Sequence, residues 1–239
     1  MSGEYLADLT EFFNGTKYGT LNKQIAASLL DAAKITVGEG DEAEEKLFAV
    51  PNNHIVGQYK YLLINKTKAR EYFISDKDLA GFTTPDSANE LKALITADGD
   101  DPADYIKTVE GNYEDKAKYE ADGYACNVIT YPTATVEDAF SGAFAVVNTT
   151  KDVERAMEIV YAINNDVTLH NYLTYGIPAT NYAIDKDNNV IRDKEGNSVY
   201  IMKYLYTGDV FKSHYCPELG WTSDAAKYGE AQNLDSVFN

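Results

Sequence analysis

The stretch that most constrains the fold is residues 144–182, FAVVNTTKDVERAMEIVYAINNDVTLHNYLTYGIPATNY. It opens with an apolar run that predicts a short strand over residues 144–147, and a hydroxyl at residues 148–150 can cap the helix that follows. Asp152 and Glu154 lie in its first turn, where carboxylates suit the positive end of the helix dipole. Five apolar residues then recur at steps of three and four and predict one buried helix face: Val153, Ala156, Met157, Val160 and Ile163.

The second half of this stretch predicts a tight elbow and a short helix. Residues 164–166, Asn-Asn-Asp, end the first helix and cap a second one over residues 167–175. Gly176 is typical of a left-handed C-cap, and Pro178 bars any continuation of the helix. This order of elements indicates a structural scaffold rather than a catalytic centre. It consists of a strand, a long helix, a tight turn and a short helix that ends at a glycine.

The rest of the chain alternates short strands with amphipathic helices and predicts an α/β or α+β class. Helices are expected over residues 3–13, 21–34 and 221–232, and after Thr84-Pro85 with a stripe of Leu91, Leu94 and Ile95. Residues 104–119 are predicted to be loosely helical and residues 38–45 to be a solvated loop. Strands are expected over residues 46–50 and 58–65, which could pair, and over 123–131, 182–193 (a hairpin) and 199–206.

Several segments resemble bacterial extracellular solute-binding proteins, the capture subunits of ABC importers, and in particular the large family-1 lipoproteins. Besides residues 144–182, the resemblance rests on YLADLTEFF, KLFAVPNN, YKYLLINK, YTGDVFKSHYCPELGW and AQNLDSVF, which occur in the family's order. The likeness spans most of the chain. It implies an α/β fold of the periplasmic-binding-protein type II architecture, with a mixed sheet and flanking helices.

The resemblance also implies an incomplete, two-lobed molecule with lobe crossovers near residues 50–54, 130–135 and 176–182. Family members are longer, and YLADLTEFF normally follows a complete βαβ segment, so we expect a truncated chain that lacks the first lobe's opening strands. The sequence shows no signal peptide and no lipid-anchor cysteine near Met1. The resemblance implies an extracellular or cell-surface location, with a membrane-anchored lipoprotein as the full-length form.

Charge and cysteine content restrict the partners and the chemistry. A net charge of −17 over 239 residues argues against nucleic acid and against an anionic membrane surface, because their phosphates would be repelled. Cys126 and Cys216 lie far apart in the sequence, which leaves a disulfide open but favours two buried free thiols. Nineteen tyrosines against one tryptophan suit binding clefts and wet surfaces, although for most of them we favour a plain surface role.

The known signatures of enzymes are missing from the sequence. It has no metalloprotease helix, nucleophile elbow, phosphate loop or dinucleotide fingerprint, and no catalytic residue, cofactor or metal ligand is predicted. His54, His170 and His214 are scattered without metal-ligand spacing. Asp185 begins a faint likeness to a calcium loop, but Val190 replaces the required glycine and a hairpin turn is favoured.

Five residues are candidates for contact with a sugar, because sugars combine flat apolar faces with a rim of hydroxyls. Trp221 follows Gly220 in a loop-like stretch, and Tyr131 and Tyr175 stand at segment ends. Asn52 and Asn53 follow a strand end at another direction change. By the resemblance, lobe crossovers line the cleft in this family. The competing interpretation is that Trp221 packs in the core and that the two asparagines only shape a turn.

The first hypothesis is non-catalytic capture of a carbohydrate or oligosaccharide, held between two lobes and delivered to an ABC permease in the membrane. The second is a truncated surface protein or domain of the same fold that binds a protein partner or has lost ligand binding. A third and weaker hypothesis is a glycan-active enzyme. The sequence also leaves open whether the chain forms a homo-oligomer that completes a truncated fold.

Overall fold

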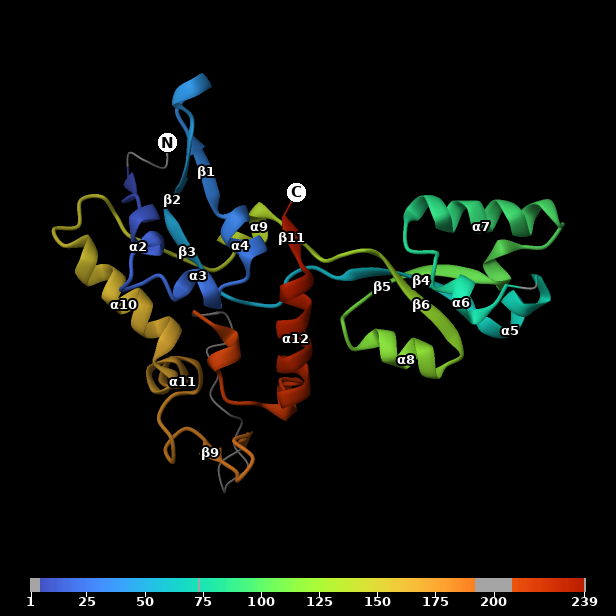
Figure 1. Cartoon of the computed structure of the whole chain (residues 1–239). Coiled ribbons are helices and arrows are strands. Elements are labelled where there is room, and N and C mark those ends of the chain that lie inside the picture. The colour runs from blue at the N-terminus through green and yellow to red at the C-terminus, as the bar shows by residue number, and fades with distance from the viewer. Residues whose placement is uncertain (1–4, 73, 192–207, 239) are drawn as a thin grey trace. The chain divides into compact units, whose positions relative to one another are not determined.

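The computed structural model describes residues 5–72, 74–191 and 208–238. The chain forms two compact units: unit 1 comprises Met1–Val56 and Ala134–Asn239, and unit 2 comprises Gly57–Thr133. Unit 2 is one continuous insertion in the sequence of unit 1, and its elements run from cyan to green in Figure 1. Residues 176–182 lie inside unit 1. Lobe crossovers near residues 50–54, 130–135 and 176–182 stay predictions.

Unit 2 is built on an antiparallel sheet of three strands in the order β5-β4-β6, flanked by helices. Its strands and helices are β4 (Tyr59–Asn65), α5 (Lys66–Ala69), α6 (Asp76–Leu79), α7 (Pro85–Ala97), β5 (Ile106–Gly111), α8 (Asp115–Ala121) and β6 (Tyr124–Thr130), with 3₁₀ turns at Arg70–Tyr72 and Pro102–Asp104. The strand β7 (Thr133–Ala134) follows at the junction with unit 1. The strands predicted over residues 58–65 and 123–131 are confirmed.

The central strand β4 is buried on both faces, and its alternating residues sort into two cores. Leu62 and Ile64 pack with Leu91 and Ile95 of α7 on one face. Residues on the other face of β4 form a second core toward α8: Tyr59, Tyr61 and Leu63, packed with Cys126, Val109, Tyr119, Tyr124 and Val128. A helix, a sheet and a helix therefore form three layers, which is why this strand reads as an almost continuous apolar run.

Three predictions for unit 2 are corrected by the structure. The residues predicted to be loosely helical over 104–119 contain the strand β5, because their backbone groups pair with β4 over a full antiparallel register, and only the part from Asp115 onward is α-helical, in α8. Leu94 is exposed, so the buried stripe of α7 consists of Leu91 and Ile95 without it. The strand over 58–65 does not pair with residues 46–50, because β4 lies between β5 and β6.

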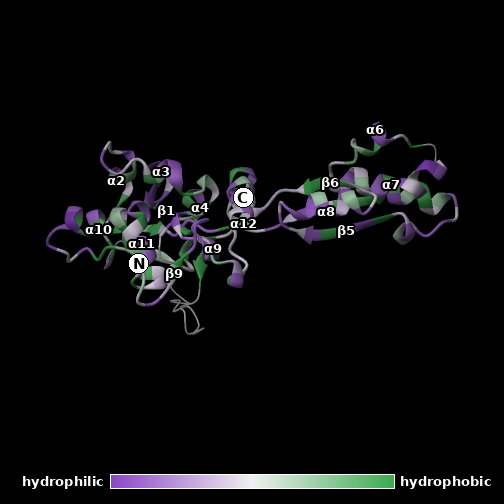
Figure 2. Cartoon of the chain, turned by 90° about the horizontal axis from the view of Figure 1, so that it is seen from below, coloured by the Kyte–Doolittle hydropathy of each residue, from purple (hydrophilic) through white to green (hydrophobic). Residues whose placement is uncertain are grey.

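Helix α7 illustrates a boundary that local chemistry sets. The Thr84 hydroxyl accepts a hydrogen bond from the backbone N–H of Ser87, and the Ser87 side chain bonds back to Thr84, which forms a capping box. Pro85 occupies the first helical position, where its missing N–H costs nothing. Figure 2 shows that α7 carries both hydrophobic and hydrophilic residues, as expected of a helix with one buried face.

Unit 1 contains more elements, in shorter pieces. Its helices are α2 (Thr10–Asn14), α3 (Leu21–Gln24), α4 (Ala27–Ala32), α9 (Val136–Phe140), α10 (Val153–Asn165), α11 (Val167–Tyr175) and α12 (Ser223–Asp235), with 3₁₀ turns η1 (Gly40–Glu42), η4 (Val210–Lys212) and η5 (Pro217–Leu219). Its strands are β1 (Lys34–Val37), β2 (Glu44–Leu47), β3 (Ala49–Pro51), β8 (Ala143–Ala145), β9 (Ala183–Ile184), β10 (Val190–Ile191) and β11 (Val237–Phe238). Antiparallel pairs join β1 to β2, β3 to β8, and β9 to β10.

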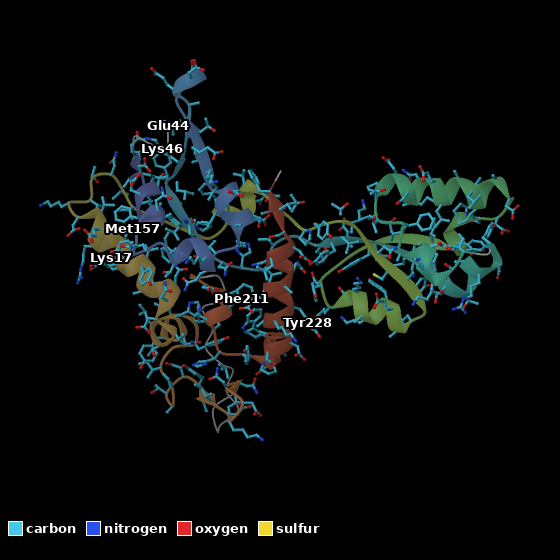
Figure 3. All side chains as sticks on the ribbon, in the orientation of Figure 1. Lys17, Glu44, Lys46, Met157, Phe211 and Tyr228 are labelled. Atoms are coloured by element: carbon cyan, nitrogen blue, oxygen red, sulfur yellow. The ribbon has the colours of Figure 1, made fainter. Side chains whose placement is uncertain are left out.

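The two helices predicted within residues 144–182 are confirmed as α10 and α11. Met157, Val160 and Ile163 of α10 are buried, and Met157, labelled in Figure 3, belongs to the main core of unit 1. Asp166 ends α10 and caps α11 by accepting hydrogen bonds from the N–H groups of Thr168 and Leu169. The hydroxyls at residues 148–150 do not cap α10, because the Asp152 carboxylate accepts the bond from the first turn.

Gly176 ends α11 as predicted, in a variant of the expected conformation. Its φ of 86° lies in the region that favours glycine, but its ψ of −149° is extended rather than left-handed helical. A Cβ at this position would lie 2.6 Å from the side-chain oxygen of Asn181, whose amide oxygen accepts the N–H of Ile177. The exit from the helix is therefore fixed by this side chain as well as by Gly176.

The N-terminal part of unit 1 differs from its prediction in two places, at the helices expected over residues 3–13 and 21–34. Among the described residues, the helix expected over residues 3–13 is interrupted after Tyr5: Leu6 forms a bridge with Val147, and the helix α2 begins at Thr10. The acidic loop expected over residues 38–45 is confirmed as solvated: all eight residues are exposed, residues 38–43 form the tip of the β1–β2 hairpin, and Glu44 and Glu45 begin β2. The helix expected over residues 21–34 is interrupted between α3 and α4 by a side chain from another segment, described below.

In the C-terminal part of unit 1, the described residues form the elements that the sequence predicted. The β9–β10 hairpin is confirmed, with Asp185 accepting the N–H groups of Asp187 and Asn189, and Asn188 adopting a φ of 64° in the turn. The final helix α12 is confirmed, capped by the Thr222 hydroxyl. The strand expected over residues 199–206 lies outside the described residues.

Both cysteines are buried free thiols, Cys126 in unit 2 and Cys216 in unit 1, as the sequence favoured. Within the described ranges, no helix has the length and apolar composition needed to cross a bilayer. In the same ranges, no group of three or more His, Cys, Asp or Glu residues is arranged to hold a metal ion.

Candidate functional site

Unit 1 contains a cavity of about 490 Å³ with a mixed polar and apolar lining, a volume typical of small-molecule sites. Its walls come from three parts of the sequence: α3 with the start of α4, the turn η4, and the C-terminal half of α12. The residues that line it are Asn22, Lys23, Gln24, Ile25, Ala26, Ala27, Asn53, Asp209, Phe211, Lys212, Glu230, Asn233, Leu234 and Ser236. Most of these side chains can donate or accept a hydrogen bond, so the cavity suits a polar ligand.

One wall is aromatic. Phe211, labelled in Figure 3, projects from η4 beside α12 and lies 5.9 Å from the ring of Trp221, centroid to centroid. Its ring approaches the helix because Gly229 has no side chain: a Cβ there would lie 3.2 Å from Phe211 and 2.5 Å from Ile55. Gly229 therefore allows the aromatic ring to pack directly on the helix backbone.

The floor is formed by Asn53 and Asp209. The Asn53 amide donates to an Asp209 carboxylate oxygen at 3.0 Å, and the same carboxylate oxygen accepts the N–H of Phe211 at 3.1 Å. Burial raises the pKa of Asp209 above its usual range, although these two hydrogen bonds act in the opposite direction. The floor is thus a buried carboxyl group held in place by one side chain and one backbone group.

The charges around the cavity balance. Lys23 and Lys212 contribute two ammonium groups, and Asp209 and Glu230 contribute two carboxyl groups. The side-chain oxygen of Gln24 is buried without a hydrogen-bond partner in the described part of the chain, while its amide nitrogen donates to Asn165. An unpartnered acceptor and balanced charges favour a neutral ligand with hydroxyl groups over an ionic one.

Asn53 also explains the break between α3 and α4. Its amide nitrogen donates to the carbonyl of Gln24 at 2.8 Å, and its amide oxygen accepts the N–H of Ala26 at 3.1 Å. These two bonds satisfy backbone groups that a continuous helix would have paired internally. The sequence pattern predicted one helix because the residue that divides it lies 27 positions further along the chain.

Asn52 and Asn53 belong to a set of buried amides that hold the segment from residue 52 to 56. The side-chain oxygen of Asn52 accepts the N–H of Gly208 at 2.8 Å. From α12, Asn233 accepts the N–H of Val56 and donates to the carbonyl of His54, and Gln232 donates to the carbonyl of Val56. Both asparagines predicted to bind ligand therefore bond to the protein itself. Asn53 also lines the cavity.

Tyr175 and Trp221 lie in the same small core, and neither of them lines the cavity. Tyr175 is buried, its hydroxyl donates to the carbonyl of His214 at 2.9 Å, and burial raises its pKa. Trp221 packs at the edge of the same small core, with its indole nitrogen buried and unpartnered among the described residues. Trp221 reaches the cavity only through the ring of Phe211, and a ligand role for either residue stays a prediction.

Tyr131 lies in unit 2 and more than half of its surface is exposed. It is thus placed in a different unit from the other four candidates. Sequence reasoning missed Gln24, Lys212 and Glu230, which line the cavity. Gln24 appeared to belong to one helix, and the other two lie in segments without a local binding signal, so only their tertiary proximity marks them.

Comparison with known proteins adds to this geometry. No protein-family description and no curated protein matches the sequence. Among solved structures, the N-glycan transport solute binding protein NgtS from Streptococcus pneumoniae is similar at 14% identity and a TM-score of 0.54. Its complexes with Man1GlcNAc and Man5GlcNAc give TM-scores of 0.53 and 0.50, each at 16% identity. Each alignment covers 98% of this chain and 67–69% of the other.

This chain has the fold of a solute-binding protein. The resemblance inferred from the sequence is therefore confirmed at the level of the fold, with its mixture of helices and sheets. The three similar structures are all of the solute binding protein NgtS, two of them in complex with Man5GlcNAc or Man1GlcNAc. At this identity, the likeness concerns the arrangement of the backbone and assigns no residue of this chain to a ligand.

Proposed function

We propose that this chain captures a neutral carbohydrate solute, without chemical conversion, for an ABC-type importer. The observation that carries the proposal is the fold, which is shared with an N-glycan transport protein over 98% of this chain. We further propose the family-1 class, the type II architecture and an extracellular or cell-surface location. The permease of the importer would be the membrane partner.

The cavity of unit 1 supports a sugar as the solute. It combines amide, hydroxyl and charged groups with the aromatic wall of Phe211. Sugars present hydroxyls that donate and accept together, and planar amides and carboxylates match them. The balance of two lysines and two acids leaves no net charge to attract an ionic solute.

Thermal unfolding in the presence of ligands tests the proposal. The panel contains Man5GlcNAc, Man1GlcNAc and maltopentaose, with single amino acids and a short peptide as the comparison. A hundredfold excess over the dissociation constant stabilises the native state by about 2.7 kcal/mol, which raises Tm by a few degrees. We expect a saturable rise with one class of oligosaccharide, and mass spectrometry of the recovered sugar should show it unchanged.

Variants of residues that line the cavity test whether the ligand binds there. Gln24→Leu removes the unpartnered oxygen and Lys212→Ala removes an ammonium group, while Lys116→Ala changes an exposed lysine of unit 2 as the matched control. We expect the first two to reduce the ligand-induced rise and the control to retain it. A transition that no sugar moves would refute carbohydrate capture and favour a protein of this fold that binds a protein partner or no ligand.

A further inference from the structure

Unit 2 carries two exposed tyrosines, Tyr113 and Tyr131, that pack on Tyr59, a buried tyrosine of one of its cores. The rings of Tyr113 and Tyr131 both pack edge-on against Tyr59, at centroid distances of 6.2 and 6.3 Å and interplanar angles of 61° and 60°. Tyr59 is 2% exposed, whereas Tyr113 is 42% and Tyr131 is 52% exposed. We call Tyr59, Tyr113 and Tyr131, with the neighbouring Gln58 and Asn112, the tyrosine ledge.

The loop that carries Tyr113 is fixed by hydrogen bonds. Tyr61 donates its hydroxyl to the carbonyl of Asn112 at 3.0 Å, and the N–H of Asn112 donates to the Asp115 carboxylate at 2.8 Å. Gly111 makes room for this arrangement, because a Cβ there would lie 3.1 Å from that carboxylate. Tyr113 is thus presented on a loop whose backbone is already ordered.

The segment that carries Tyr131 is restrained as well. Pro132 follows Tyr131 and limits its backbone to extended conformations. Gly57 has a φ of +55°, and a Cβ on it would lie 2.8 Å from the backbone nitrogen of Thr133. The backbone of residue 57 therefore packs directly on residues 132–133. Both exposed rings are held in place before any ligand arrives, which lowers the entropic cost of binding.

Amide groups accompany the rings. Gln58 donates its side-chain N–H to the amide oxygen of Asn112 at 3.4 Å, and both side chains are exposed. A sugar ring has a flat face of C–H groups and an edge of hydroxyls, so exposed tyrosine rings beside exposed amide side chains match both parts. Tyrosine supplies this contact area at a small loss of side-chain entropy.

We propose that the tyrosine ledge is a carbohydrate-contacting surface of this protein, on which a neutral hexopyranose unit stacks against Tyr113 and Tyr131. The proposal rests on the proposed function and assigns part of the sugar recognition to unit 2. The centroids of the Tyr113 and Tyr131 rings lie no farther apart than the sum of their distances to the Tyr59 ring. This spacing suits a short oligosaccharide. The net charge of −17 makes an anionic glycan unfavourable.

Calorimetric titration of the full chain with Man5GlcNAc, Man1GlcNAc and maltopentaose tests the proposal. Tyr113→Ala and Tyr131→Ala should each weaken binding about 3- to 10-fold, and the double variant about 10- to 100-fold, since each removes one stacked ring. Tyr131→Phe keeps the ring and should bind within about threefold of the wild type. Tyr172→Ala, at a tyrosine of α11 that is 48% exposed, is the matched control and should bind like the wild type.

Thermal unfolding without ligand establishes whether each variant folds. We expect the variants to fold, because Tyr113 is 42% exposed and Tyr131 is 52% exposed. If the wild type binds a sugar and the double variant binds it equally well, the ledge is not a recognition surface while carbohydrate capture stands. If the wild type binds none of the three oligosaccharides, the proposed function and the ledge both fail.

Discussion

At the residue scale, Asn53 has a larger structural role than any other residue predicted to bind ligand. Its one amide group contacts Gln24, Ala26 and Asp209, and so joins the break between α3 and α4 to the floor of the cavity. A side chain that satisfies several buried backbone groups is costly to remove, because each group left without a partner loses its hydrogen bond in a site that water does not reach.

Asn53→Ala should therefore lower the free energy of unfolding of unit 1 by about 3 kcal/mol, since buried partners are left unsatisfied. Chemical denaturation followed by circular dichroism measures the change. Asn89→Ala, at an exposed asparagine of α7, is the control and should stay within about 0.5 kcal/mol of the wild type. Equal stabilities for Asn53→Ala and the wild type would mean that the amide bonds do not hold the helix break.

Asp209 gives a prediction on pH dependence. Its folded pKa is raised by burial, so the stability that the neutral carboxyl provides is complete below the ordinary pKa of 3.8 and is lost as pH rises through the folded pKa. Asp209→Asn can keep the acceptor for Asn53 and Phe211 without ionising. The variant should therefore gain stability relative to the wild type as pH rises from about 3.8, in denaturation measured at several pH values.

Asp185→Asn is a control for which the opposite pH dependence of stability is expected. Hydrogen bonds, first from the Asn189 side chain, lower the pKa of Asp185. Its contribution is present above the ordinary pKa and is lost as pH falls through the lowered folded pKa, so this variant should lose stability relative to the wild type as pH rises. The same slope in both variants would contradict the assignment of a raised pKa to Asp209.

At the element scale, the starts of several helices followed the sequence where the cap was local, although α10 is capped by Asp152 and not by the hydroxyls of residues 148–150. Thr84 with Ser87, Thr135 with Asp138, and Asp166 with the first turn of α11 set the starts of their helices through bonds within three residues. Predictions failed where the deciding partner was distant in sequence. The β5 strand forms because β4 pairs with it, although its own residues are polar and carry little strand signal.

Helix α7 allows a test of which face is buried, with two leucines on one helix. Leu91 is 2% exposed and Leu94 is 54% exposed. Leu91→Ala should cost about 2–5 kcal/mol, because it leaves a cavity in the core between α7 and the sheet. Leu94→Ala should change stability by less than about 0.5 kcal/mol. Chemical denaturation of both variants measures the two changes in the free energy of unfolding. Equal losses of stability in the two variants would show that the helix buries another face.

At the scale of the whole molecule, the two units have separate hydrophobic cores. The cores of unit 2 use residues of β4, β6 and α7, and those of unit 1 use residues of α4, α10 and the C-terminal segment. Each unit holds one buried free cysteine, so thiol reactivity reports the opening of each unit separately.

Leu91→Ala should accelerate the alkylation of Cys126 by iodoacetamide and leave Cys216 unchanged. A loss of 2 kcal/mol in unit 2 would raise the open population, and with it the alkylation rate, about 30-fold. Mass spectrometry of the two cysteine-containing peptides measures both rates in one sample. Equal acceleration at Cys216 would show that the units unfold as one, and the Leu94→Ala variant should accelerate neither.

The sequence alone determined the α10–α11 elbow and the locally capped helices, because each depends on residues close together in the chain. It also predicted the mixed class of helices and strands and the solute-binding resemblance, because these rest on a series of short segments whose order along the chain is visible in the sequence. Only the tertiary structure decided the break between α3 and α4, the strand β5 and the cavity of unit 1. Those features depend on contacts such as Asn53 with Ala26 or Asp209, which join segments 27 and 156 positions apart. Local sequence patterns do not predict such contacts, because tertiary packing determines which distant residue lies beside each group.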